Sequence, residues 1–503
     1  MNNDSSKQIK VGAVLSYFIL FFNIICGLLY TPWMIRKIGT EDYGLYVLVT
    51  TFLNYFVVDF GIWQAVTKIL SRKRAEGDKE GIRKVLGITT KIYLILDFVI
   101  ICILLLVYPN IERLFPNLQA NHLSSFRIVF CIAAFFSVLS FPFGFVKGIF
   151  VSYEYYIQTK IFDLLVKILI IVFTVIALCL NGGLYALVLC YGLVPFVINV
   201  SRVIFLRIKG IRIDIRAHSR AIVKELFAVS GWIMLAVFSE LFINNIAPSI
   251  LAARSTIEQV SVFGIGLTIC NYFYSFAMSI NGLFLPRVTE YRVNGDDSEI
   301  HALTSRVGRI QCIILGAVLG GFVTCGTDFL LLWVGSDFQL SYYVAIAIMC
   351  PQMVIAMWHI ETVNLLVSDK IKYQAISGFL TACLSVILAI ALSPIIGALG
   401  AAFAIGVSNS VFMIGLMSYF YRKQLSFPIY EYVRRVLPVI VVLLLAIGVV
   451  FLVSIFIHTS NLLFSFIIKA IVFILAYITL LLFVVDSYEK EYVDRMLQKL
   501  KIK

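Results

Sequence analysis

Long apolar stretches recur along the whole chain, separated by short polar segments rich in Asn, Gly, Ser and Asp, which favour turns. A helix needs roughly 20 mostly apolar residues to cross a bilayer. Fourteen stretches meet this requirement, at about residues 11–35, 43–66, 85–107, 126–151, 161–180, 184–206, 225–252, 260–285, 310–333, 342–367, 374–393, 399–420, 436–457 and 462–485. The pattern predicts an all-α polytopic membrane protein with about fourteen transmembrane helices.

The composition supports this prediction. Hydrophobic residues make up 61% of the 503 residues and charged residues 14%, against roughly 45–50% and about 25% in soluble domains. Water cannot be the solvent for so much apolar surface. The composition therefore excludes a soluble enzyme, a soluble nucleic-acid-binding protein and a disordered scaffold.

Lys and Arg residues alternate between the two sides of the predicted helices. With the N-terminus placed inside, the inner segments hold 31 Lys and Arg residues and the outer loops hold 4. Short cytoplasmic loops are enriched in Lys and Arg, so we expect both termini to lie in the cytoplasm. The net charge of +13 is then explained by the basic residues of the cytoplasmic loops, and we expect no nucleic-acid partner.

An internal repeat has an offset of 217 residues. Glu41 matches Glu258, Thr51 matches Thr268, and residues 54–56 match residues 271–273, each Asn-Tyr-Phe. Two further matches at this offset pair Tyr156 with Tyr373 and Gly183 with Gly400. The offset spans six predicted helices, an even number, so the repeats are parallel, as in one class of secondary transporters. We expect an N-terminal lobe at 1–210, a C-terminal lobe at 211–424, and two additional helices with a tail at 425–503.

Two local motifs resemble a known family. Ile38-Gly-Thr-Glu-Asp-Tyr-Gly-Leu-Tyr46, followed by Asp59-Phe-Gly-Ile62, is similar to the first two helices of bacterial Wzx-type polysaccharide flippases. Gly183-Leu-Tyr-Ala186 and Gly400-Ala-Ala402 are similar to the starts of helices 6 and 12 in that family. These flippases belong to the multidrug/oligosaccharidyl-lipid/polysaccharide exporter superfamily.

The resemblance implies a function and a location. Such flippases move undecaprenyl-pyrophosphate-linked oligosaccharide units from the cytoplasmic to the outer leaflet of the bacterial inner membrane, for surface polysaccharides such as O-antigen and lipopolysaccharide. The implied partners are the polyprenyl-pyrophosphate-linked oligosaccharide and membrane lipids. An assembly with a polysaccharide polymerase or glycosyltransferase is left open.

Basic residues within the predicted helices are candidates for binding the pyrophosphate. Lys91, Lys147, Lys167 and Arg202 lie one or two turns from the expected cytoplasmic ends of four successive helices. Facing inward, they would form a cationic ring suited to a phosphate group; alternatively, they extend to the interface as anchors. Lys37 and Arg254 occupy equivalent repeat positions at the outer ends of two helices, where they either guide an anionic headgroup or anchor the helices.

Acidic residues within the predicted helices are candidates for ion coupling. Glu240 lies near the middle of 225–252, with Asn244 one turn later on the same face, so we expect a cavity-lining or cation-coupling role. The alternative is a neutral Glu that bridges two helices. Asp59 and Glu361 are further candidates; Asp59 alternatively pairs at a helix end with Lys68. Asp97 and Asp163 lie near the lysines, and Asp163 is one turn before Lys167.

The sequence carries no sign of enzyme chemistry. The ten cysteines lie in apolar stretches without metal-ligand spacing, the five histidines are scattered, and no glycine-rich phosphate loop is present. We therefore expect no cofactor, no metal site and no enzyme activity, and a gradient of H⁺ or Na⁺ as the energy source. Two alternatives remain: a drug or metabolite exporter of the same superfamily, and a membrane-embedded glycosyl- or acyltransferase.

Overall fold

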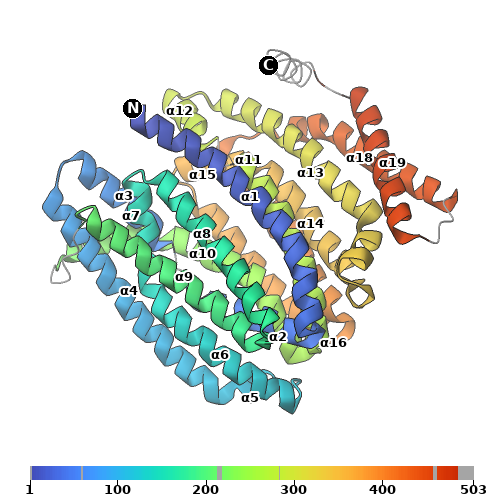
Figure 1. The fold of residues 1–503 in the computed structure, drawn as a ribbon. Helices are drawn as coiled ribbons and strands as arrows, with labels where there is room; N and C mark the ends of the chain where they lie inside the picture. The colour runs from blue at the N-terminus through green and yellow to red at the C-terminus, as the bar shows by residue number, and fades with distance from the viewer. Residues whose placement is uncertain are drawn as a thin grey trace. The chain divides into compact units, whose positions relative to one another are not determined.

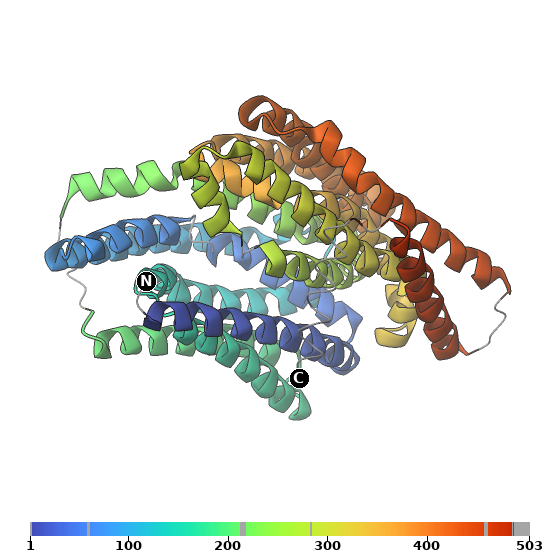
Figure 2. The ribbon, with the colours of Figure 1, turned by 90° about the horizontal axis from the view of Figure 1, so that it is seen from above.

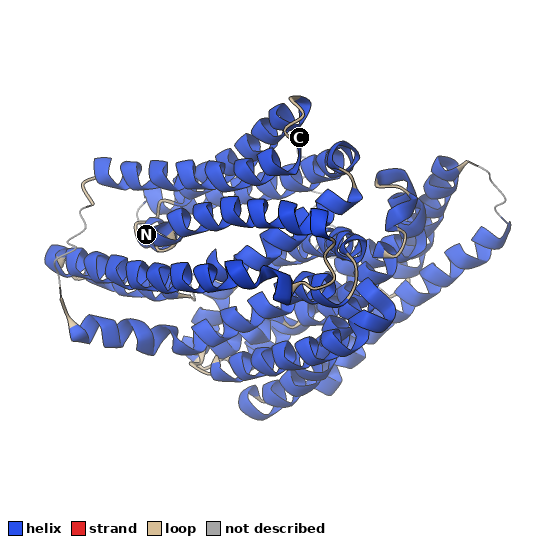
Figure 3. Ribbon diagram, turned by 90° about the horizontal axis from the view of Figure 1, so that it is seen from below, coloured by secondary structure: helices blue, strands red, loops and turns tan. Residues whose placement is uncertain are grey.

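The computed structural model describes residues 3–57, 61–211, 218–281, 284–456, 461–484 and 486. All regular secondary structure in these ranges is helical, and Figure 3 shows no strand among them. The predicted all-α fold is confirmed. The helices group into two compact units, one of residues Met1–Tyr272 and Asp369–Met417 and the other of Phe273–Ser368 and Ser418–Lys503.

The first unit contains most of the helices. They are α1 (Asn3–Ile38), α2 (Thr40–Val57), α3 (Ile62–Ala75), α4 (Lys79–Val107), η1 (Tyr108–Asn110), α5 (Ile111–Leu114), α6 (Ala120–Ser140), η2 (Phe141–Phe143), α7 (Val146–Ser152), α8 (Tyr156–Cys179), α9 (Gly183–Ile208), α10 (Arg220–Arg254), the first part of α11 (Ile257–Asn281), α16 (Lys372–Ser408) and the π-helix η4 (Asn409–Leu416). Helix α10 packs along α16, α2 and α3, and α8 packs against both α1 and α9. The α1, α8 and α9 ribbons are visible in Figure 1.

The second unit is built around one long helix, α13 (Asp297–Trp333). Its other elements are α12 (Leu285–Asn294), η3 (Ser336–Phe338), α14 (Ser341–Met357), α15 (His359–Val367), α17 (Met417–Leu425), α18 (Ile429–Phe456) and α19 (Leu462–Leu482). Helices α14, α18 and α19 all pack against α13, and Figures 1 and 2 show α18 and α19 as neighbours. Segments expected to lie between spans, at 285–294 and 297–309, are therefore helical.

Arg309 links three helices of the second unit. Its side chain is buried, and its guanidinium donates to the Arg435 carbonyl oxygen of α18 at 2.6 Å and to the Val484 carbonyl oxygen just beyond α19. Asp486 lies 3.4 Å from the same guanidinium. A buried guanidinium needs such acceptors because leaving it unpaired is costly. Arg309 thus fixes α18 and α19 to α13.

Twelve helices in the described ranges are long and apolar enough to cross a membrane. One of these segments, Lys372–Leu425, is interrupted by non-helical backbone at Ile396 and Gly397, where the sequence predicts a break between 374–393 and 399–420. Helix α2 is not among the twelve, although a span was expected at 43–66. The chain is a multi-pass membrane protein, and the count of fourteen stays a prediction.

Side-chain caps begin several helices. Asp78 precedes α4, and its Oδ1 accepts a hydrogen bond from the Gly81 backbone N–H at 2.7 Å. This bond, together with the neighbouring Lys73 ammonium, lowers the pKa of Asp78. Asn461 likewise accepts from the Leu463 backbone N–H at the start of α19. Such caps satisfy N–H groups that have no partner within the helix.

The break in α16 has an identifiable cause. Pro394 lacks the backbone N–H that an α-helix needs, and Gly397 adopts a left-handed φ of 56°. The Gln259 side chain then accepts a hydrogen bond from the Ala398 backbone N–H at 2.9 Å. Proline, glycine and a glutamine from α11 together end one helix and begin the next.

Helices α2 and α11 cross at residues related by the 217-residue offset. A Cβ atom at Gly44 would lie 2.5 Å from Ser261 Oγ, and one at Gly264 would lie 2.7 Å from Val47 Cγ2. Ser261 Oγ also donates to the Thr40 carbonyl oxygen at 2.6 Å. Each residue therefore contacts its own counterpart, as a two-fold axis at this crossing requires. The repeat over the whole chain, and the domains 1–210, 211–424 and 425–503 derived from it, stay predictions.

Candidate functional site

Helices α8 and α9 bring two of the predicted cations to one carboxylate. Arg202 Nη2 lies 2.6 Å from Asp163 Oδ1, and the guanidinium also stands over the Phe162 ring at 5.7 Å. Lys167 lies one turn after Asp163 on α8, on the same face of the helix. The ion pair of Asp163 that the structure shows is with Arg202. A carboxylate, a guanidinium and an amine are thus brought close together by two neighbouring helices.

Lys147 and Lys91 have different neighbours. Lys147 is exposed on α7, and its Nζ lies 4.9 Å from the centroid of the Trp63 ring on α3, a cation–π contact. Lys91 Nζ on α4 lies 3.3 Å from His218 Nε2, just before α10. The structure therefore brings Arg202 and Lys167 together, whereas Lys147 and Lys91 contact other groups. All four belong to the first unit, and a closed ring stays a prediction.

Lys37 and Arg254 occupy matching positions in the last turns of their helices. Lys37 lies in the last turn of α1 and Arg254 in the last turn of α10, and both side chains are exposed. A cation at a helix C-terminus is favoured by the helix dipole. This placement is compatible with either of their two predicted roles.

Glu240 and Asn244 lie on an exposed face of α10. The apolar span of this helix is Gly231–Arg254, so Glu240 is well inside it. The adjacent Asn245 instead faces α2, where its Oδ1 accepts a hydrogen bond from Asn54 Nδ2 at 3.1 Å. The sequence marked Asn54 only through its match in the repeat. The candidate Asp59 lies outside the described residues.

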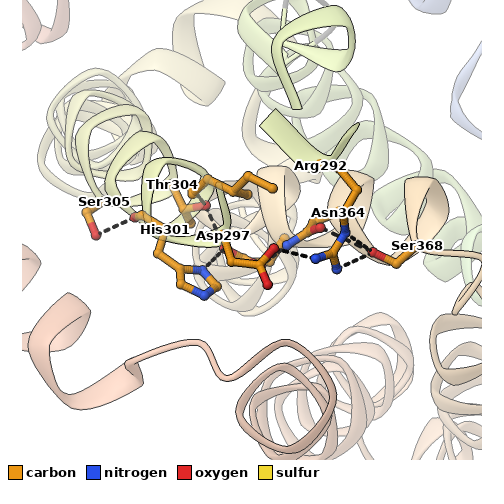
Figure 4. A network of polar contacts seen from close by, with 9 residues as sticks. Arg292, Asp297, His301, Thr304, Ser305, Asn364 and Ser368 are labelled. Atoms are coloured by element: carbon orange, nitrogen blue, oxygen red, sulfur yellow. Dashed lines mark hydrogen bonds and ion pairs between the residues drawn. The ribbon is translucent and has the colours of Figure 1, made fainter. Parts of the chain in front are cut away.

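Glu361 belongs to a polar network in the second unit, of which Figure 4 labels His301, Thr304 and Asn364. The Glu361 side chain is 0% exposed. Thr304 Oγ1 donates to Oε1 at 2.8 Å, Asn364 Nδ2 donates to Oε2 at 3.1 Å, and His301 Nδ1 lies 3.1 Å from Oε1. These groups come from α13 and α15, so the carboxyl of Glu361 joins two helices and does not line a cavity in this conformation.

The network continues from Asn364 to α12. Ser368 Oγ lies 3.4 Å from Asn364 Oδ1, and Arg292 Nε donates to Ser368 Oγ at 2.8 Å. Arg292 also forms an ion pair with Asp297 at the start of α13. Figure 4 shows these side chains in one chain of contacts. The start of α13, all of α12 and the end of α15 are held together by polar side chains.

Asp328 and Lys469 form an ion pair that joins α13 to α19. Asp328 Oδ2 accepts from Lys469 Nζ at 2.7 Å and from Ser465 Oγ at 2.9 Å. Beside it lies an apolar pocket of about 480 Å³, lined by Phe322, Phe329, Phe466 and Phe473 among other residues of the same two helices. The polar pair fixes the two helices at the point where their surfaces form this pocket.

The sequence identified Glu361 but not its partners. The available signal was spacing: Glu361 and Asn364, and likewise His301 and Thr304, lie three residues apart and share a helix face. Nothing in the sequence indicates that these two helix faces contact each other. Within the described ranges, no group of three or more His, Cys, Asp and Glu side chains is arranged to hold a metal ion.

Comparison with known proteins gives both a family and a fold. A sequence profile described as "Polysaccharide biosynthesis protein" matches residues 12–290, which is more than half of the chain. An "Uncharacterized membrane protein EpsK" of Bacillus subtilis (strain 168) is 23% identical over 351 residues. That match spans 66% of this chain and 66% of the relative, just under two thirds of its length.

Solved structures with the same fold are transport proteins. A structure titled "Lipid II flippase MurJ, inward closed conformation" superposes with a TM-score of 0.69 at 16% identity, covering 93% of this chain and 98% of that one. An inward-facing multidrug resistance MATE family transporter of the MOP superfamily gives 0.63 at 15% identity, covering 82% and 98%. A MOP superfamily transporter from Pyrococcus furiosus gives 0.59 at 14% identity, covering 84% and 95%. At these identities the likeness shows the fold.

Proposed function

Because this chain belongs to the polysaccharide biosynthesis protein family, we propose that it moves polyprenyl-pyrophosphate-linked oligosaccharide units from the cytoplasmic to the outer leaflet of the bacterial inner membrane. The proposed mechanism is alternating access driven by an ion gradient, with the lipid tail remaining in the bilayer. The protein is then a transporter rather than an enzyme, with both termini in the cytoplasm. Its product would supply surface polysaccharide synthesis.

The observation that carries the proposal is the set of cations in the membrane helices of the first unit. Lys91, Lys147, Lys167 and Arg202 come from four different helices, α4, α7, α8 and α9. Asp163 forms an ion pair with Arg202, and the three lysines are further basic groups of the same unit. Charged groups inside a membrane are costly, so an excess of cations needs a compensating anion. A pyrophosphate supplies that anion with many acceptor oxygens.

The exposed face of α10 supports a polar path through the membrane. Glu240 and Asn244 are exposed within an otherwise apolar span. Facing lipid hydrocarbon, a charged carboxylate at the helix centre would cost ~2.5–3.5 kcal/mol on insertion scales. A water-filled cavity removes this cost. We therefore assign Glu240 and Asn244 to the wall of the path that the oligosaccharide or the coupling ion follows.

The lipid tail has a separate requirement. A polyprenyl chain is apolar and needs contact with hydrocarbon or apolar side chains throughout transport. The pocket between α13 and α19 is lined almost entirely by apolar residues and is compatible with a lipid chain. The family match favours the lipid-linked sugar over a drug as the substrate, because the fold alone is shared by both kinds of transporter.

Deletion of the gene tests the proposal. We expect surface polysaccharide to disappear while intact lipid-linked oligosaccharide accumulates on the cytoplasmic leaflet, and the wild-type gene to restore both. Loss of surface polysaccharide without accumulation would place the defect before translocation. Unchanged surface polysaccharide in a strain with no second gene of this family would contradict the proposal and favour drug or metabolite export.

A further inference from the structure

The middle of α4 carries a carboxyl group that the proposed headgroup site does not use. Asp97 lies ten residues before the end of α4 at Val107 and eighteen after its start at Lys79. With a rise of 1.5 Å per residue, the nearer end is about 15 Å away. A short aspartate side chain cannot reach an interface over that distance, unlike a lysine near a helix end.

Asp97 belongs to the covered face of α4. Thr89, Tyr93, Ile100 and Leu104 share this face at helical spacing and are all buried. Residues on the other face, including Ile95 and Phe98, are exposed. Asp97 itself is only 8% exposed. Its carboxyl group therefore points into the helix bundle of the first unit.

The surroundings of Asp97 offer it no partner. Its Oδ1 is buried, and no donor in the described part of the chain forms a hydrogen bond with it. Tyr93, one turn earlier, packs against Phe141 and Phe145 with ring centroids 5.4 and 5.3 Å apart. The neighbouring Thr89 hydroxyl is also buried without a hydrogen-bond partner. One turn from Asp97, this face of α4 thus packs against aromatic rings.

Charged groups on the helices packed against α4 form no hydrogen bond with Asp97 Oδ1 among the described residues. The elements that make the main contacts with α4 are α3, η1, η2, α6 and α10. Their titratable side chains are Lys68, Arg72, Lys73 and Arg74 on α3, Tyr108 on η1, His122, Arg127 and Cys131 on α6, and Arg220, Lys224, Glu225, Glu240 and Arg254 on α10. Tyr93, Cys102 and Lys91 are the nearest titratable groups on α4 itself.

Three other acidic residues of the apolar helices have side-chain partners in the structure. Asp163 has Arg202, Asp328 has Lys469 and Ser465, and Glu361 has Thr304, Asn364 and His301. Those partners stabilise the ionised form. Without them, a carboxylate in an apolar surrounding takes up a proton, because the isolated charge is far more costly to bury than the neutral acid.

We infer that Asp97 is the proton-binding site of the transport cycle. The carboxylate binds H⁺ and is held as the neutral acid while this face of α4 is covered, as in this structure. Movement of the helices that exposes the face to water lets the proton leave. The coupling part of this inference rests on the proposed function.

Infrared spectroscopy tests proton binding directly, without any substrate. On acidification, the purified wild-type protein should gain the carbonyl band of a protonated carboxylic acid at a higher pH than exposed aspartates do, and Asp97→Asn should lack that step. Asn has the size of the neutral acid, so the variant should fold. Asp337→Asn, which replaces an exposed aspartate of η3, is the matched control and should keep the step. The same titration of this band in wild type and Asp97→Asn would overturn the proton-binding site.

Transport in proteoliposomes tests coupling. Wild-type protein should move lipid-linked oligosaccharide faster with an imposed pH gradient than without one, and Asp337→Asn should do the same. Asp97→Asn should lose the acceleration by the gradient while keeping gradient-independent movement, and Asp97→Glu should recover part of the acceleration. Full acceleration in Asp97→Asn, or none in wild type, would overturn the coupling role. If wild type moves no oligosaccharide at all, the proposed function fails, and the infrared result alone decides whether Asp97 binds a proton.

Discussion

Glu361 illustrates what determines the role of a carboxyl group inside a helical membrane protein. The sequence predicts a polar residue within an apolar stretch, and with it either a functional or a structural role. The structure supplies Thr304, Asn364 and His301 as neighbours, which favours a structural role as the link between α13 and α15. Asp97 has a similar sequence context but no such neighbours. Neither environment follows from spacing along one helix, because the partners come from other helices.

Replacing Glu361 by Ala should strongly destabilise the second unit. The change leaves two or three buried donors without an acceptor, and each unsatisfied buried group costs about 1–3 kcal/mol. We expect a clear fall in the thermal unfolding midpoint in detergent, and a smaller fall for Glu361→Gln, which keeps one acceptor oxygen. Glu299→Gln, an exposed position on the first turn of α13, is the control. Equal midpoints for Glu361→Ala and the control would contradict the structural role.

Removing cations from the first unit should slow transport without affecting folding. A hydrogen bond to a charged group contributes about 1.5–3 kcal/mol, and 1.4 kcal/mol corresponds to about tenfold. The double variant Lys91→Gln, Lys167→Gln should therefore reduce restoration of surface polysaccharide by about tenfold or more in the deletion strain. Lys84→Gln removes a lysine paired with Glu80 at the start of α4 and should restore it fully. Full restoration by the double variant, at equal protein levels, would exclude these lysines from headgroup binding.

Individual helices were the feature of the structure that the sequence predicted best. Apolar length predicted nearly all the long helices, and the proline and glycine of the break in α16 could be located because both residues have strong backbone preferences. The short helices α12 and α15 could not be separated from loops or from longer spans. Both are fixed by the network around Arg292 and Glu361, which is a tertiary property.

Gly397→Ala should weaken the break in α16. Its φ of 56° is unfavourable for a residue with a side chain, and the new Cβ would lie 2.4 Å from Gln259 Oε1. Such backbone strain costs about 1–3 kcal/mol, so the unfolding midpoint should fall. Gly448→Ala in α18, where a Cβ has open space, should be neutral or stabilising because Ala favours helices by about 1 kcal/mol. The reverse order of midpoints would show that the break is not as described.

A cysteine pair tests whether α2 and α11 separate during transport. Gly44 and Ser261 are in direct contact, so Gly44→Cys with Ser261→Cys, in a chain without other cysteines, should form a disulfide under mild oxidation. If alternating access parts these helices, the oxidised protein should not transport and reduction should restore it. A Cβ at Gly44 would also lie 2.5 Å from the Ile257 carbonyl oxygen, so we expect the Gly44→Cys single variant to transport more slowly than wild type, and equally under both conditions, and Ser261→Cys to transport normally. Transport by the fully cross-linked protein would show that the crossing stays closed throughout the cycle.

The whole molecule combines a shared transporter fold with chemistry particular to this chain. Hydropathy and the 217-residue offset predicted a transporter with parallel repeats, and the equivalent contacts at the α2–α11 crossing agree with that plan. The sequence resemblance to polysaccharide flippases was confirmed by the family match. Which charges face the transport path was not predictable, because side-chain direction depends on how each helix is rotated within its bundle.

The most direct test of the account is to measure translocation of a lipid-linked oligosaccharide by the purified protein. Proteoliposomes are loaded with a polyprenyl-pyrophosphate oligosaccharide on the inner leaflet, and an impermeant lectin outside detects each sugar that crosses. We expect the protein to expose the sugar well above the rate of protein-free vesicles, and the Lys91→Gln, Lys167→Gln protein to be slower. Exposure no faster than in protein-free vesicles, by folded protein under a pH gradient of either direction, would show that the protein does not translocate this lipid-linked oligosaccharide.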